Sequence, residues 1–505
     1  MMKAKPMQKV KTFLEKTPNA LLCVLGAVVF LAGFYFLTSR TPLNKIWLPT
    51  TMNNDEVLYN RQVVSVITHG GPQGYFGYQE GTADIGRYGT WGPLLIWAYA
   101  LPGFLFGSSV NVVLWCNLLF ITLGIAAFAR SAKLNWWQCI VLCAGLFAIA
   151  MPIRSCISGA SEAMHYMLAF LIVGSAAALH RSDKTGWLAV CAAACAVETI
   201  FRPYALLFWG FPLTAVWQNK RRRSVCFITA AAGFGVSLFA MTKLAAPYFS
   251  DGGMDFDGVQ LLLQGHPIAA IRYEWIRATA LLGNAWLYDI WPTIKGGKTY
   301  IGGGCVTFLV VVLAAVGCLL WDKRKGRPVV LKACALFCSA VIALVLLTMY
   351  NIDPRHMMLL AILLLGAIVV EDAAPAVVWL PILVVLLLPM NFERGSQPEM
   401  NEVMAAQMTV VGDALAADVQ AAGADPWDNT LAYTYDDGVF HGYLYAVPDG
   451  MGIEFDKNSY LWDAENPIYS RYVMCGHGTR VEERLLAENW QELVSTEDLV
   501  VYKRS

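Results

Sequence analysis

Residues 20–38 form the apolar run ALLCVLGAVVFLAGFYFLT, which contains no charged side chain. Five lysines precede this run, at positions 3, 5, 9, 11 and 16. A helix of about 20 apolar residues crosses the hydrocarbon core of a bilayer, and a basic flank favours the cytoplasmic side. A signal peptide is the alternative, but no clear small-residue cleavage site follows the run. We therefore predict an uncleaved membrane anchor with a cytoplasmic N-terminus.

The composition of the whole chain agrees with a membrane protein. Of its 505 residues, 57% are hydrophobic and only 15% are charged, whereas a soluble protein carries about 25% charged residues. This shortfall excludes an ordinary soluble enzyme, a disordered chain and a nucleic-acid-binding protein. The net charge of zero is unevenly divided, because residues 1–390 carry 30 basic and 17 acidic side chains and residues 391–505 carry 7 and 20. Such an asymmetry indicates two regions in two environments.

Further apolar runs follow the anchor and are separated by basic clusters. The runs lie at about 91–106, 109–129, 136–153, 162–180, 187–201, 203–217, 224–246, 303–320, 329–350, 356–371 and 374–390. The basic clusters should face the cytoplasm, which makes the run 91–106 an interfacial or re-entrant segment. Pro203 would break a single helix, so residues 187–217 are predicted to form a hairpin of two short spans. These assignments predict an α-helical polytopic membrane protein with about eleven spans.

This topology divides the chain into two domains. Residues 1–390 form a transmembrane domain with outer loops 39–108 and 247–302, and residues 391–505 form a small extracytoplasmic α/β domain. In the second domain, a 3.6-residue period predicts a helix over 398–422. Strand-like runs follow at 430–435, 473–475 and 499–502. The compact loops favour a multi-pass protein of a plasma or bacterial inner membrane.

An acidic pair lies in the first outer loop. The stretch Asn53–Arg61 reads NNDEVLYNR and begins a helix-like segment with Asp55 and Glu56 in its first turn. The dipole at a helix N-terminus favours ionised carboxylates. The structural alternative is that Asp55 caps the helix and Glu56 is a solvated acid.

Other charged motifs follow in outer loops and at the ends of spans. Glu198 and Arg202 lie four residues apart beside Pro203, and Arg355 and His356 lie at the outer end of a span. Charges within apolar stretches indicate a functional site. The alternatives are an ordinary ion pair on one helix face and simple anchoring of a helix end. In the loop 247–302, Lys295 and Lys298 are candidate ligands or ordinary solvated side chains.

The order of these motifs resembles that of the GT-C membrane glycosyltransferases, near the protein O-mannosyltransferases and aminoarabinose transferases. Those enzymes have an Asp-Glu pair in the first outer loop, a Pro-containing interfacial segment that ends in Phe-Gly, a broken hairpin with a basic residue before proline, and an arginine before the last spans. The matching positions are Asp55–Glu56, Trp91–Pro93 through Phe106–Gly107, Arg202–Pro203 and Pro354–His356. The resemblance covers about residues 19–390, and the C-terminal domain matches no family known to us.

The resemblance implies inverting sugar transfer from a polyprenyl-phosphate-linked donor to an extracytoplasmic acceptor. Asp55 is then the general base, and Glu56 positions the acceptor or a metal. The candidates that bind the donor phosphate are Arg87, Arg202, Lys295, Lys298, Arg355 and His356. Arg87 enters this set because Gly92 occupies the position before the interfacial proline, where some relatives have a basic residue. No cofactor is certain, and a divalent metal is possible because paired carboxylates serve either purpose.

Two other classes of function compete with this interpretation. A secondary transporter or flippase of lipid-linked or sugar substrates also uses broken helices and intramembrane charges, but the sequence shows no inverted repeat. A membrane scaffold with a partner-binding outer domain is the third class. The expected partners of a transferase are the lipid-linked donor, the extracytoplasmic acceptor and the bilayer, with no nucleic acid.

Overall fold

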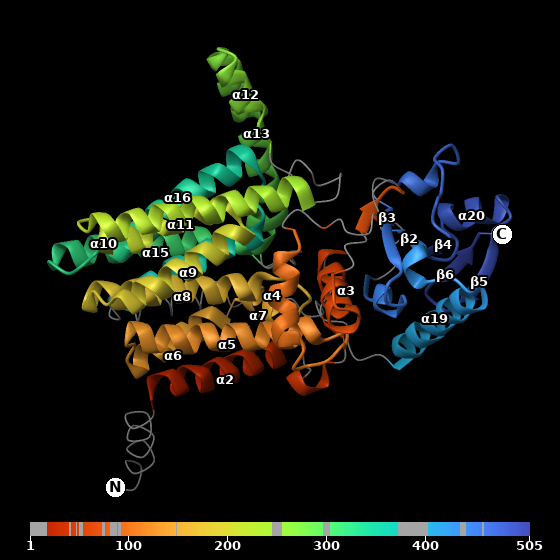
Figure 1. Cartoon of the computed structure of the whole chain (residues 1–505), viewed down its shortest axis with the longest axis horizontal. Coiled ribbons are helices and arrows are strands. Elements are labelled where there is room, and N and C mark those ends of the chain that lie inside the picture. Colours follow the sequence, from red (N-terminus) through yellow and green to blue (C-terminus); the bar gives the residue numbers. More distant parts are fainter. Residues whose placement is uncertain are drawn as a thin grey trace, which may run out of the picture.

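The structure is a computed structural model with two parts, a helical bundle and an α/β region at one end of it (Figure 1). It describes residues 18–39, 42–46, 48–49, 54–72, 76–80, 88, 92–147, 149–244, 255–295, 303–371, 402–434, 441–456 and 459–504. The predicted run 374–390 and the candidate ligands Arg87 and Lys298 lie outside these residues.

Within the described residues, six helices are long and apolar enough to cross a membrane. They are α2 (Asn19–Ser39), α5 (Val112–Ala132), α8 (Glu162–Ser182), α11 (Lys220–Phe239) with its extension to Leu244, α15 (Gly304–Arg324) and α16 (Val330–Met349). Shorter apolar helices are α4 (Leu94–Gly103), α6 (Trp136–Phe147), α9 (Thr185–Phe201), α10 (Gly210–Val216) with the preceding 3₁₀ turn η2 (Pro203–Trp209), and α17 (Pro354–Glu371). The chain is therefore a multi-pass membrane protein, and the count of about eleven spans stays a prediction.

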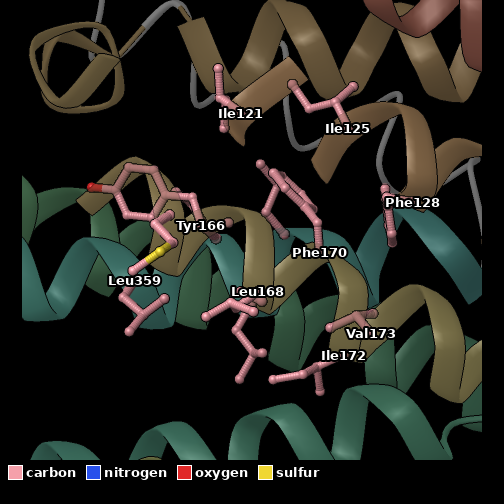
Figure 2. Close-up of a cluster of buried hydrophobic side chains, with 14 of the residues drawn as sticks. Ile121, Ile125, Phe128, Tyr166, Leu168, Phe170, Ile172, Val173 and Leu359 are labelled. Atoms are coloured by element: carbon pink, nitrogen blue, oxygen red, sulfur yellow. The ribbon is translucent and has the colours of Figure 1, made fainter. Parts of the chain in front are cut away.

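Helix α8 forms the centre of the bundle and packs against α5, α9 and α17. Figure 2 shows Phe128 of α5 beside Phe170 of α8, with ring centroids 5.2 Å apart. Gly174 of α8 faces α5 so closely that a Cβ there would lie 2.3 Å from Ser131 Oγ. Since small residues let helices approach closely in membranes, this contact sets the spacing between α5 and α8.

The hairpin of residues 187–217 is broken where the sequence predicts. Helix α9 ends at Phe201, Arg202 adopts an extended conformation, and η2 begins at Pro203. The Arg202 backbone N–H still donates to the carbonyl of Glu198 at 2.8 Å. The break therefore turns the chain without losing that hydrogen bond, and it separates the Arg202 side chain from the regular helix surface.

The C-terminal region contains one six-stranded sheet of order β1-β3-β2-β4-β6-β5. Its strands are β1 (Phe76–Tyr78), β2 (Thr430–Thr434), β3 (Gly452–Asp456), β4 (Tyr472–Cys475), β5 (Gln491–Ser495) and β6 (Val500–Lys503). The first four are parallel, and β6 runs antiparallel to β4 and β5. Side chains alternate between the two faces of a strand, so Leu431 and Tyr433 pack with α19 (Glu402–Ala421), whereas Ala432 packs with α20 (Arg480–Ala487).

The predicted helix and strands of this region are present. Helix α19 lies within the predicted range 398–422, and β2, β4 and β6 match the three predicted strands to within two residues. Strands β1, β3 and β5 are additional. Strand β1 belongs to the segment 39–108, which the sequence predicts as the first outer loop, and pairs with β3 in the register Phe76↔Ile453 and Tyr78↔Phe455. The sheet is thus completed by a segment far from it in the sequence.

Helix α3 (Asn54–His69) links the same loop to the C-terminal region. Arg61 of α3 is buried and donates to the carbonyl oxygens of Val447 at 2.6 Å, Pro448 at 2.9 Å and Met451 at 3.0 Å. These carbonyls follow the 3₁₀ turn η7 (His441–Ala446). A guanidinium has five N–H donors in a planar fork, so a single side chain fixes α3 to this loop.

Replacing Arg61 with alanine should loosen α3, because several buried carbonyls lose a charged donor, at a cost on the order of 3 kcal/mol. We expect faster hydrogen–deuterium exchange of the α3 and η7 amides in the purified full-length protein. Arg504→Ala, at an exposed position, is the control and should leave this exchange unchanged. Unchanged exchange in the Arg61 variant would contradict the linking role.

Candidate active site

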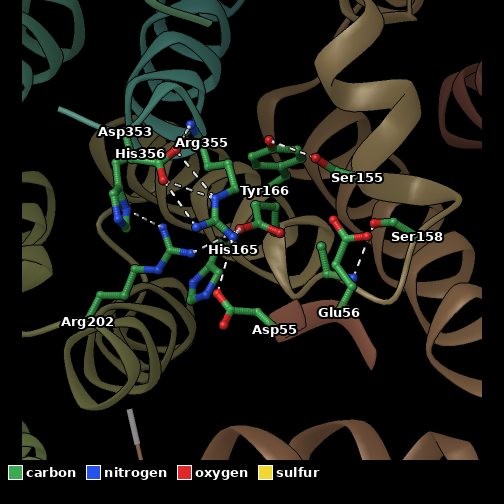
Figure 3. Close-up of polar contacts among 12 residues, drawn as sticks. Asp55, Glu56, Ser155, Ser158, His165, Tyr166, Arg202, Asp353, Arg355 and His356 are labelled. Carbon is green, nitrogen blue, oxygen red and sulfur yellow. Dashed lines mark hydrogen bonds and ion pairs between the residues drawn. The ribbon is translucent and has the colours of Figure 1, made fainter. Parts of the chain in front are cut away.

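The predicted acidic pair and two of the predicted arginines lie at the end of the bundle that faces the C-terminal region. Figure 1 shows α3 and α4 running across this end of the bundle helices. Asp55 and Glu56 occupy the first turn of α3, Arg202 lies at the break after α9, and Arg355 and His356 begin α17. Figure 3 shows Asp55, Arg202, Arg355 and His356 gathered around one point.

Arg355 is the centre of this group. Its Nη1 atom lies 3.7 Å from Asp55 Oδ2 and 3.8 Å from Glu162 Oε1, and its Nη2 atom lies 3.1 Å from Asp353 Oδ2. The backbone N–H of Arg355 also donates to Asp353 Oδ1 at 2.8 Å. One guanidinium thus faces three carboxylates, which suits a group that is largely removed from water.

Asp55 is the most exposed acid of the three, with 35% of its side chain accessible, against 16% for Asp353 and 6% for Glu162. Desolvation raises the pKa of Asp55 above its usual value, and the charge of Arg355 opposes the rise. A carboxylate with a raised pKa is a better proton acceptor than an ordinary aspartate. Asp55 is therefore the most accessible of the three carboxylates, and desolvation raises its pKa.

Glu162 was not predicted as a site residue. It is the first residue of α8 and is buried, and its Oε1 atom lies 3.8 Å from both Arg202 and Arg355. Its other carboxylate oxygen, Oε2, has no hydrogen-bond partner among the described residues. The available sequence signal was an acid directly after the small-residue stretch SGAS at 158–161. Glu162 holds the two guanidinium groups on one side of the site.

A second polar cluster, formed by Arg202 and Tyr204, surrounds His356. Arg202 Nη1 donates to the Tyr204 hydroxyl at 3.0 Å and lies 3.0 Å from His356 Nδ1, and the Tyr204 hydroxyl lies 2.9 Å from the same nitrogen. Glu198, the predicted alternative partner of Arg202, instead contacts His165 Nδ1 at 2.9 Å. Arg202 is therefore directed towards the site and does not form the simple helix-face pair.

Glu56 has different surroundings from Asp55. Its side chain is fully buried and forms an ion pair with Arg154, so the solvated-acid alternative is wrong for this residue. A Cβ at Gly159 would lie 2.3 Å from the Glu56 carbonyl oxygen, which shows how closely the two backbones approach. Burial, together with the nearby charge of Glu56, raises the pKa of Tyr445 in the C-terminal region. Glu56 thus anchors the first turn of α3 through its ion pair with Arg154.

The structure does not bring Lys295 into this group. The Lys295 ammonium lies over the ring of Trp291, 4.7 Å from its centroid, just after α14 (Trp291–Ile294). Among the described residues, no three His, Cys, Asp or Glu side chains are placed to hold a metal ion. Figure 3 shows Asp55 beside Arg355 and Glu56 well apart from it. Glu56 pairs with Arg154 instead.

This arrangement suits the handling of an anion next to a proton acceptor. The guanidinium groups of Arg202 and Arg355 can stabilise negative charge that develops on a bound group, because they are held in place before the reaction. Asp55 lies on the accessible side of Arg355 and can accept a proton from a neighbouring hydroxyl.

The fold is shared with membrane glycosyltransferases, although no protein-family model and no curated protein matches the sequence. The oligosaccharyltransferase AglB from Archaeoglobus fulgidus, solved with an inhibitory peptide and a dolichol-phosphate, gives a TM-score of 0.52 at 10% identity, over 92% of this chain and 70% of AglB. A structure of the oligosaccharyltransferase of the same organism, tethered to an acceptor peptide with an NVT sequon, gives 0.51 at 10% identity, over 98% and 75%.

A third similar structure is ArnT from Cupriavidus metallidurans bound to undecaprenyl phosphate, with a TM-score of 0.43 at 14% identity, over 95% of this chain and 97% of ArnT. The oligosaccharyltransferase structures show that this chain shares their fold, in agreement with the GT-C resemblance seen in the order of its motifs. At 10% identity the similarity concerns the fold.

The Glu56–Arg154 pair should be essential for stability. Glu56→Gln leaves a buried guanidinium without its counter-charge, and breaking such a pair costs about 3–5 kcal/mol. We expect a lower unfolding midpoint in detergent, with most of the loss recovered in the double variant Glu56→Gln/Arg154→Met. The control is Asp183→Asn, which breaks an exposed pair with Arg222 and should cost less than about 1 kcal/mol. Equal midpoints for Glu56→Gln and this control would contradict the assignment.

Proposed function

We propose that this protein is a membrane glycosyltransferase that moves a sugar from a polyprenyl-phosphate-linked donor to an extracytoplasmic acceptor. The GT-C fold supports the general kind of reaction. The observation that carries the proposal is the placement of the accessible Asp55 carboxylate 3.7 Å from the Arg355 guanidinium, with Arg202 and His356 beside it. Sugar transfer needs the base that activates the acceptor and the group that binds the donor phosphate to lie next to each other, so that both reach the same anomeric carbon.

The reaction is a single displacement at the anomeric carbon. Asp55 takes the proton of an acceptor hydroxyl, and the acceptor oxygen forms a bond to that carbon. The bond from the same carbon to the donor phosphate oxygen breaks, and its electron pair leaves with the lipid phosphate. One displacement inverts the configuration of the anomeric carbon. Arg202 and Arg355 stabilise the charge that develops on the leaving phosphate, and Asp55 needs no metal to accept the proton.

The remaining polar residues position this machinery. Glu162 lies between the two guanidinium groups and limits their orientations. His356 is fixed by Arg202 and Tyr204, on the phosphate side of the site. Lys295 lies over Trp291 and has no part in the proposed chemistry. Arg87 and Lys298 keep the roles that the resemblance implies.

The proposal also places the N-terminus in the cytoplasm and residues 391–505 on the opposite side, because the basic clusters then obey the positive-inside rule. The test is protease treatment of oriented vesicles with detection of a C-terminal tag. Protease outside right-side-out vesicles should digest the C-terminal region, and inside-out vesicles should protect it. Digestion only from the cytoplasmic side would overturn the topology and the extracytoplasmic site together.

Asp55→Asn tests the chemical role directly. The variant keeps the size of the side chain but removes the base, so transfer should fall by about 10²–10⁴-fold while the protein remains folded. Mass spectrometry of the glycans lost in a deletion strain first identifies the product, and transfer is then measured in proteoliposomes with and without EDTA. The control is Asp183→Asn, at an exposed position.

Four outcomes distinguish the candidate functions and the role of a metal. Loss of transfer in Asp55→Asn with retained binding of the lipid donor supports the proposal, whereas unchanged transfer refutes the role of Asp55. Substrate counterflow in liposomes with no new glycosidic bond would identify a transporter or flippase instead. If EDTA abolishes transfer and a divalent cation restores it, the proton transfer is metal-assisted and the metal-free step is wrong.

A further inference from the structure

Residues 257–285 form a helical arm that projects sideways from the bundle. We call this segment the lateral arm; it consists of α12 (Asp257–Leu263) and α13 (Pro267–Ala285). Figure 1 shows the lateral arm, in green, extending transverse to the neighbouring helices α11 and α16. A helix in this orientation does not cross the membrane, so its exposed surface needs its own explanation.

The lateral arm has a continuous apolar stripe. Along α13, the exposed fractions are 83% for Ile268, 70% for Ile271, 71% for Trp275 and 50% for Leu282. Their separations of three, four and seven residues place these side chains on one face of the helix. Leu263 at the end of α12 is 82% exposed. Such a concentration of large exposed apolar side chains on one helix face marks an interaction surface.

The opposite face of α13 holds the arm against the bundle. Arg277 donates to the carbonyl oxygens of Thr348 and Tyr350 and lies 3.3 Å from Asp255 Oδ2. The Asp255 backbone N–H in turn donates to the carbonyl of Met349 at 2.8 Å. These contacts attach the arm to the last turn of α16, a candidate span. The arm therefore lies at the depth where α16 leaves the hydrocarbon core.

Aromatic residues continue the surface beyond the arm. Trp286 and Trp291 stack with ring centroids 5.8 Å apart, and Tyr288 between them is 73% exposed. Tryptophan and tyrosine are enriched at the membrane–water interface. Arg277 faces the bundle and not the stripe, and the stripe positions themselves carry no charged side chain. The exposed Arg272 lies beside the stripe, where a basic side chain can reach the headgroups.

We propose that the lateral arm lies flat in the leaflet of the bilayer next to the active site, with its apolar stripe among the acyl chains. An amphipathic helix at the interface buries its apolar face about 5–10 Å into the headgroup–acyl boundary. The depth set by the Arg277 contacts and the transverse direction of α13 match this position. The occupant of the stripe is thus lipid, and the arm fixes the depth of the bundle in the membrane. The proposal does not depend on the transfer reaction.

The test uses nitroxide labels on the full-length protein in phosphatidylcholine nanodiscs. Single cysteines are introduced as Ile271→Cys and Trp275→Cys on the stripe. Leu344→Cys on the exposed surface of α16 is the lipid-facing control, and Asp463→Cys in the C-terminal region is the water-facing control. The spectrum of the labelled parent protein is subtracted because the native thiols, although buried, can react in detergent.

Stripe labels should be relaxed by oxygen and shielded from a water-soluble nickel chelate, as the label at 344 is. Their accessibility to the chelate should be at least several-fold lower than that of the label at 463. Accessibility equal to that at 463 would overturn the proposal, since the stripe would then lie in water. Shielding accompanied by dipolar coupling between labels on two chains would overturn it in favour of contact with a second copy.

Discussion

Three carboxylates from distant parts of the chain surround the guanidinium of Arg355, and the rest of the site depends on this cluster of ion pairs. Buried charges must be paired, because an uncompensated one costs several kcal/mol. Asp55 comes from α3, Glu162 from the start of α8 and Asp353 from the turn before α17. The packing of the bundle must therefore align three helix starts at a single point. The close contact at Gly174, well inside α8, contributes to that alignment.

Much of this site is visible in the sequence because charge is conspicuous in an apolar background. Asp55, Arg202, Arg355 and His356 are all predictable as unusual polar residues beside spans, and all four lie together in the structure. Their partners are harder to find. Glu162 occupies an ordinary position after a short polar stretch, and its importance lies in contacts with segments that are remote in the sequence. No local pattern encodes such contacts, because Glu162 reaches Arg202 and Arg355 only when the helices of the bundle pack together.

The same limit applies to the fold. The break before Pro203 and the strands β2, β4 and β6 follow from local chemistry, namely the missing N–H of proline and short apolar runs between turn residues. Strand β1 has only three residues, FGY at 76–78, and these form a strand because β3 offers an open edge. Lys295 shows the reverse case, since a basic residue in a suitable loop lies over a tryptophan ring and not in the site.

Strand β1 also imposes an order on biosynthesis. Its partner β3 lies more than 370 residues later in the chain, so a ribosome that adds roughly 5–20 residues per second needs tens of seconds to produce it. During that interval Phe76 and Tyr78 have no partner strand, and in a chain truncated before β3 they stay unpaired. Conversely, an isolated segment 402–504 would expose the edge of β3, and open edges promote aggregation. Each of the two segments thus depends on the other, because β1 is unpaired until β3 has been made and the edge of β3 is open without β1.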